Sequence, residues 1–234
     1  MLRPGFVGER SPRADHVPHE PDAHPAEYRY GAVFFLAVVL LVFLILAPDA
    51  DWTLATALAL EGAALFVAVA TARERRVVRR RRALVTAVAS ALAVAGVATG
   101  ALPEAVGLAA CGILAIAIPF ALGGGLLRLV RERGVTLDAV AGSLTIYLLV
   151  GLTFAWAIGL AARVADTPYF EEGTDASPSQ RLYYSFTVLT TTGFGDLTPA
   201  GSLGRALAVA EMLLGQLYLV TVLGVMVSNF ARRR

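Results

Sequence analysis

Long apolar stretches separated by short polar turns dominate the chain. Six of them approach or exceed the length of about 20 residues with which a helix crosses a bilayer. They lie at about 30–47, 52–72, 83–102, 105–127, 137–164 and 204–230. The pattern predicts an all-α membrane protein with six transmembrane helices.

A seventh, shorter helix is predicted at 178–190, just before the last span. Ser177, Pro178 and Gln180 stand at the N-cap, first and third helical positions, which is the pattern of a capping box. The segment is too short to cross a bilayer, so we expect it to enter the membrane and turn back. Its C-terminus carries about half a negative charge, which favours a cation.

Composition agrees with a membrane protein. Of the 234 residues, 57% are hydrophobic and the mean hydropathy is +0.67, above the roughly 45–50% apolar content of soluble proteins. Cys111 is the one cysteine, so no intrachain disulfide is possible. No pair of predicted spans carries a set of metal-ligating residues or a nucleophile with a base. We therefore expect no enzyme activity.

The charged residues are segregated between the two ends of the predicted spans. Arg73–Arg82, Arg128–Arg133 and Arg232–Arg234 fall on one side, which predicts cytoplasmic N- and C-termini and a plasma or inner membrane location. This topology is a sufficient explanation of Arg73–Arg82, so no nucleic-acid binding is expected, although contact with anionic lipid is possible there. The acidic side holds Asp49, Asp51, Glu104, Asp166, Glu171, Glu172 and Asp175.

The predicted organisation has four parts. Residues 1–28 are rich in proline and charge, which predicts a disordered cytoplasmic tail. A four-helix transmembrane domain at 29–127 precedes a cytoplasmic linker at 128–136, where a short interfacial helix is expected. The pore domain at 137–231 holds an outer helix at 137–164, the pore helix at 178–190, a filter at 191–195 and an inner helix at 204–230.

The segment Thr190–Pro199 carries the candidate chemistry. It reads Thr-Thr-Thr-Gly-Phe-Gly-Asp-Leu-Thr-Pro. A dehydrated cation needs backbone carbonyls in place of its water shell, and glycines allow the backbone conformations that aim successive carbonyls together. The segment resembles the selectivity filter of prokaryotic potassium channels of the pore-loop superfamily, whose core is Thr-Val-Gly-Tyr-Gly-Asp.

The resemblance implies a role for each residue around this segment. Thr191, Thr192, Gly193 and Phe194 would supply carbonyl rings to K⁺, the permeant ion, while Gly195 takes the outer position. Because one chain offers one filter, the resemblance also implies a homotetramer. Residues that would support the filter are Thr187, Thr190, Asp196 and the aromatic pair Tyr183 and Tyr184, which stand where that family often has paired tryptophans.

Two of these residues depart from the family pattern. Thr192 stands where valine or isoleucine is usual, and Phe194 where tyrosine is commoner. A weakly selective Na⁺/K⁺ channel is therefore an alternative to a potassium-selective one. A non-conducting membrane scaffold or transporter subunit is the alternative from another class.

Three residues inside the spans are further candidates. Gly215 lies twenty residues after Gly195, at the position of a gating hinge in that family, although close helix packing also explains a glycine there. Glu61 and Glu211 are intramembrane carboxylates, which are functional candidates by default. The span at 105–127 lacks the spaced arginines of a voltage sensor, so we expect little or no voltage sensing.

Overall fold

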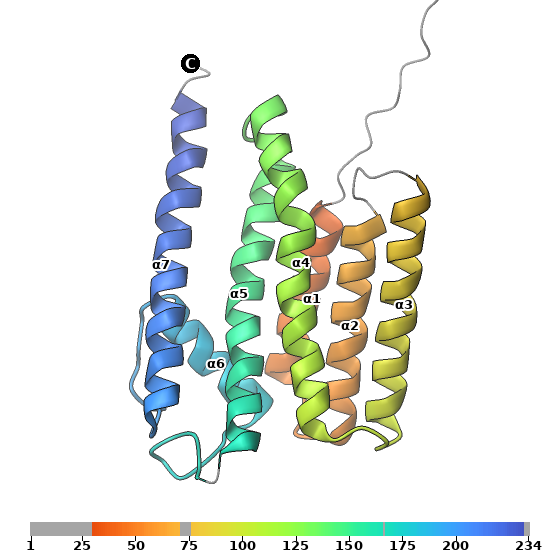
Figure 1. Cartoon of the computed structure of the whole chain (residues 1–234). Coiled ribbons are helices and arrows are strands. Elements are labelled where there is room, and N and C mark those ends of the chain that lie inside the picture. The colour runs from red at the N-terminus through yellow and green to blue at the C-terminus, as the bar shows by residue number, and fades with distance from the viewer. Residues whose placement is uncertain (1–29, 71–75, 166, 232–234) are drawn as a thin grey trace, which may run out of the picture.

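A computed structural model describes residues 30–70, 76–165 and 167–231, and the tail at 1–28 lies outside this part (Figure 1). All regular elements of the described part are helices. They are α1 (Tyr30–Leu46), α2 (Asp51–Ala70), α3 (Arg76–Ala98), α4 (Glu104–Arg133), α5 (Leu137–Val164), α6 (Pro178–Leu189) and α7 (Ser202–Ala231).

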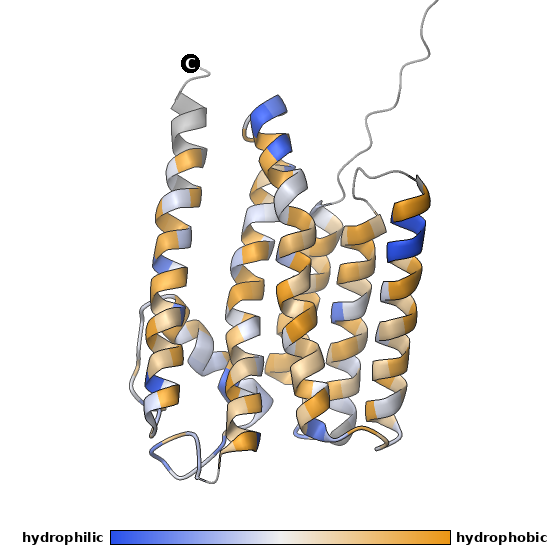
Figure 2. Cartoon of the chain, viewed as in Figure 1, coloured by the Kyte–Doolittle hydropathy of each residue, from blue (hydrophilic) through white to orange (hydrophobic). Residues whose placement is uncertain are grey.

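The long helices run up and down beside one another (Figure 1). Five of them, all but α1 and α6, are long and apolar enough to cross a membrane. Apolar residues cover most of their length, and the strongly polar positions gather near their ends (Figure 2). Helix α1 has 17 described residues, which at about 1.5 Å per residue is at the lower limit for a span. The chain is a multi-pass membrane protein.

Helix α4 is longer than predicted. It continues through Gly123–Gly125 to Arg133 and ends at Gly134, whose φ is 71°. The predicted end near residue 127, with a separate interfacial helix after it, is therefore wrong. Each glycine costs about 1 kcal/mol in a helix, whereas a helix broken in lipid leaves backbone groups unpaired at several kcal/mol each, so continuation is favoured. The connection to α5 is only Gly134–Thr136, and Thr136 Oγ1 caps α5 by accepting a hydrogen bond from Ala139 N at 3.2 Å.

A buried carboxyl joins the four-helix domain to α5. Glu61 of α2 is fully buried, and the indole Nε1 of Trp156 donates a hydrogen bond to its Oε1 at 2.8 Å. Cys111 of α4 is also buried and lies beside Glu61. The contact crosses 95 positions of sequence and ties α2, α4 and α5 together.

Helix α3 lies at the edge of the molecule and packs mainly against α2 (Figure 1). Its apolar side chains, such as Leu84 and Leu92, are largely exposed. Its first turns carry Arg79–Arg82, at the same end of the bundle as the C-termini of α4 and α7 (Figure 2). Residues 73–75 of the predicted arginine loop Arg73–Arg82, and the last two residues of the predicted span 52–72, lie outside the described part.

We predict that Trp156→Phe lowers the free energy of unfolding by about 1–3 kcal/mol, because a buried carboxyl loses its donor. Thermal unfolding of the purified protein in detergent, followed by circular dichroism, measures the change. Trp52→Phe is the matched control, since Trp52 is half exposed and its ring packs at a tilt against Phe43, with centroids 5.9 Å apart, a contact that phenylalanine retains. Equal melting temperatures for the two variants would contradict the prediction.

Candidate functional site

Helix α6 begins with the predicted capping box. Ser177 Oγ accepts a hydrogen bond from Gln180 N at 3.2 Å, and Gln180 Oε1 accepts one from Ser177 N at 2.9 Å. The helix has 12 residues, or about 18 Å, which is shorter than the hydrocarbon core of a bilayer. It rises from the end of the bundle where α5 ends to about mid-height, and the following loop returns to the same end (Figure 1).

The C-terminus of α6 is closed by the amides that follow it. Thr187 O accepts from both Thr192 N at 2.8 Å and Gly193 N at 3.1 Å, and Val188 O accepts from Thr191 N at 2.9 Å. Thr190 Oγ1 donates to Phe186 O at 2.7 Å. These bonds turn the N–H groups at the start of the predicted filter back toward α6, so the helix end and the filter form one unit.

Backbone angles alternate along this loop. The φ angle is 58° at Thr191, 54° at Gly193 and 77° at Gly195, whereas Thr192 and Phe194 have negative values. Alternation between right- and left-handed conformations collects N–H groups on one side of the chain and carbonyls on the other. The left-handed conformation costs about 1–2 kcal/mol at a residue such as Thr191, and strain of this kind clusters at functional sites.

The aromatic pair on α6 divides into two roles. The ring of Tyr183 stacks on Phe194, with centroids 6.1 Å apart and planes 6° apart, and its hydroxyl lies beside Asp196. Tyr184 is buried instead, edge-on to Phe170 at 5.0 Å. One tyrosine thus contacts the filter, while the other anchors α6 to the loop after α5.

That loop is also bound to the segment that leaves the filter. Glu171 N donates to Thr198 O at 2.8 Å, and Ala200 N donates to Tyr169 O at 2.9 Å. The Glu171 carboxylate pairs with Arg205 of α7 at 3.0 Å. Burial raises the pKa of Tyr169, so its hydroxyl stays neutral. These contacts between the loop after α5, the segment after the filter and α7 were not predicted from the sequence. Acidic residues in a loop are equally typical of a solvated surface.

Glu211 joins α5, α6 and α7. It is 1% exposed, and its Oε1 lies 2.5 Å from the Ser185 hydroxyl, which is itself 2.6 Å from Gly151 O. One hydroxyl supplies one proton, so both short contacts are full hydrogen bonds only when Glu211 carries a proton of its own. The arrangement fixes α6, about one turn before its C-terminus, to both neighbouring helices.

Gly215 allows α7 to approach the end of α6. A Cβ atom there would lie 2.5 Å from the backbone oxygen of Leu189, closer than any real contact. Helix α7 runs without a break through this position. The structure thus gives Gly215 a packing role, and its role as a gating hinge stays a prediction.

The predicted filter is exposed in the single chain. Every residue from Thr190 to Asp196 is exposed, Phe194 by 68%. The adjoining helix α7 also presents exposed apolar side chains, including Leu213, Leu217 and Val220. The structure therefore places the predicted filter, Thr190, Asp196 and Tyr183 on an uncovered side, whereas the filter-support residues Thr187 and Tyr184 are buried. Gly215 and Glu211 pack behind the filter, and Glu61 lies elsewhere, in the four-helix domain.

Comparison with known proteins points to the same region. Residues 143–232 match a family model described as an ion channel, and this range takes in most of α5, all of α6 and the filter, and α7. No curated protein and no solved structure matches the chain significantly. The match supports kinship of this part of the chain with the pore-loop channel superfamily and a channel function.

We predict that Gly215→Ala destabilises the protein by about 1–3 kcal/mol, the usual cost of overpacking, because the new methyl group meets a backbone oxygen. Gly224→Ala is the matched control on the same helix, since open space surrounds Gly224. Thermal unfolding in detergent compares the two. A Gly215→Ala variant as stable as the control would show that the close approach is not a constraint.

Proposed function

We propose that this protein is a potassium-selective channel that conducts K⁺ passively through the backbone of residues 191–195. The observation that carries the proposal is the alternating loop at the C-terminus of the capped helix α6. Carbonyls gathered on one side of such a loop replace the hydration shell of a cation. The negative end of the α6 dipole stabilises the ion before it enters the filter.

The channel is a homotetramer in this proposal. One chain supplies one loop, whereas a cage of carbonyls needs four copies around an axis. The exposure of the loop and of the apolar side chains on α7 supports this assembly, because carbonyls within a membrane must face protein, water or ions. Four copies around the loops would cover these surfaces.

Charge distribution supports an orientation in a plasma or inner membrane. The arginines of α3 and α4 lie at the end of the bundle that holds the C-terminus of α7, and this end is cytoplasmic by the positive-inside rule. The filter then opens to the outer side, where Glu171 and Glu172 raise the local concentration of cations.

Voltage sensing is not expected of this channel. Helix α4 carries its arginines only near its C-terminal end, at Arg128, Arg131 and Arg133. The work done by a membrane potential scales with the charge moved across it, about 2.3 kcal/mol per charge per 100 mV. Helices α1 to α4 form a peripheral domain that is attached to α5.

A weakly selective cation channel is the second candidate, favoured by the surroundings of Phe194 and Thr192. Phe194 is held through its ring, stacked on Tyr183, and has no hydroxyl with which to anchor the loop. The hydroxyl of Thr192 lies 2.9 Å from that of Thr190, where the family pattern has an apolar side chain. The missing hydroxyl at position 194 removes one restraint on the loop, and the rigidity of the filter affects the preference for K⁺ over Na⁺.

We predict that purified protein in liposomes carries a K⁺ flux and that Gly193→Ala abolishes it. Alanine is strained at the φ of 54° that Gly193 adopts, so the carbonyls turn away from the pathway. Gly224→Ala is the control and should conduct like the wild type. Size-exclusion chromatography checks that each variant keeps its assembly. Wild-type tetramers that give no flux would favour the non-conducting scaffold.

We predict that open probability changes little with voltage and that an Arg128→Gln, Arg131→Gln double variant behaves like the wild type. Both side chains lie at one end of α4, so little charge crosses the field. Single-channel recording over a range of potentials measures this. A steep voltage dependence that the double variant weakens would contradict the proposal for α1 to α4.

A further inference from the structure

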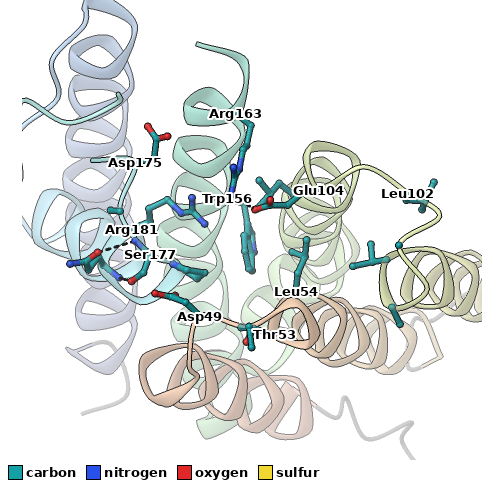
Figure 3. A pocket seen from close by; sticks show the side chains of 18 of the residues that line it. Asp49, Thr53, Leu54, Leu102, Glu104, Trp156, Arg163, Asp175, Ser177 and Arg181 are labelled. Carbon is teal, nitrogen blue, oxygen red and sulfur yellow. Dashed lines mark hydrogen bonds and ion pairs between the residues drawn. The ribbon is translucent and has the colours of Figure 1, made fainter. Parts of the chain in front are cut away.

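A cavity of about 810 Å³ lies at the end of the bundle, between the four-helix domain and the start of α6 (Figure 3). The α1–α2 turn, the α3–α4 turn, the end of α5 and the start of α6 all line it. Its walls mix apolar side chains, such as Leu54, Leu108 and Trp156, with charged ones. The proposed conduction path does not use this space.

Arg181 is the unusual residue of this cavity. It is only 4% exposed, and its Nε is buried without a hydrogen-bond partner among the described residues. Figure 3 shows its guanidinium pointing into the cavity from α6. Burial lowers the pKa of Arg181, yet a guanidinium stays charged in proteins. The buried Nε lacks an acceptor, so a ligand that brings an oxyanion to Arg181 is expected to stabilise the guanidinium.

The other charges around the cavity define what kind of anion fits. Arg163 and Glu104 neutralise each other through an ion pair at 2.8 Å. Asp175 and the exposed Asp49 remain, on either side of Arg181 (Figure 3). Asp175 Oδ1 accepts a hydrogen bond from Tyr169 N at 3.0 Å. One cation between two carboxylates disfavours a purely anionic ligand and suits one that also carries an ammonium group.

We infer that this cavity binds a zwitterion, with an oxyanion on Arg181 and an ammonium group facing Asp49. The ethanolamine phosphate headgroup of a phospholipid has this chemistry, and so does free phosphoethanolamine. The cavity lies where α2 and α4 begin and α5 ends, at headgroup depth if these helices span the membrane. A ligand here would bridge the four-helix domain and α6, whether or not the protein conducts ions.

Native mass spectrometry of the full chain in detergent tests the inference. Phosphatidylethanolamine, phosphatidylglycerol, phosphatidylcholine, phosphoethanolamine and inorganic phosphate are added separately at equal concentration. We expect an ethanolamine phosphate to be retained best and Arg181→Gln to lower its retention about tenfold, the effect of losing about 1.4 kcal/mol. Preferred retention of the lipid or of free phosphoethanolamine identifies the source of the headgroup.

Two variants separate binding from folding. Arg205→Gln removes an exposed arginine that pairs with Glu171 away from the cavity, and it should retain ligand like the wild type. Asp49→Asn alters an exposed side chain and should shift the preference from phosphatidylethanolamine toward phosphatidylglycerol. The inference is overturned if phosphatidylglycerol or inorganic phosphate binds as well as the zwitterion in the wild type. It is equally overturned if Arg181→Gln leaves retention unchanged, or if Asp49→Asn leaves the preference unchanged.

Discussion

Hydrogen-bonding of the backbone is the constraint on which the proposed placement of residues 191–195 within the membrane depends. Lipid offers no hydrogen bonds, so a non-helical loop survives there only if protein or a water-filled path surrounds it. Within one chain, the first three amides of residues 191–195 have hydrogen-bond partners, because they donate to the carbonyls of Thr187 and Val188. Residues 191–195 are otherwise exposed in the single chain, and the proposed assembly around a conduction axis would cover them.

The remaining contacts hold that loop in place. Glu211 and Ser185 fix α6 sideways to α5 and α7, and Gly215 lets α7 reach the backbone of Leu189 at the end of α6. The loop after α5 hydrogen-bonds to Thr198, which follows the predicted filter. The ion pair between Glu171 of this loop and Arg205 connects the loop to α7. Because Glu211, Gly215 and Arg205 all belong to α7, a small movement of α7 would shift residues 191–195 through three separate contacts.

Local sequence patterns are sufficient to predict the helices and some of their boundaries. The spans follow from hydrophobic length, and the capping boundaries at Ser177 and Thr136 follow from residue type, because both depend on neighbours within four positions. The end of α4 was mispredicted, since three glycines look like a break until the cost of unpaired backbone in lipid is included. The hydrogen bond between Trp156 and Glu61 and the unlike roles of Tyr183 and Tyr184 depend on distant segments, which local patterns do not encode.

Residues 191–195 select potassium through their backbone in the function that we propose. The reversal potential of the reconstituted protein between K⁺ on one side and Na⁺ on the other measures this selectivity directly. The account predicts a reversal potential far from zero, in the direction of high K⁺ permeability. A reversal potential near zero, with K⁺ and Na⁺ almost equally permeant, would contradict it.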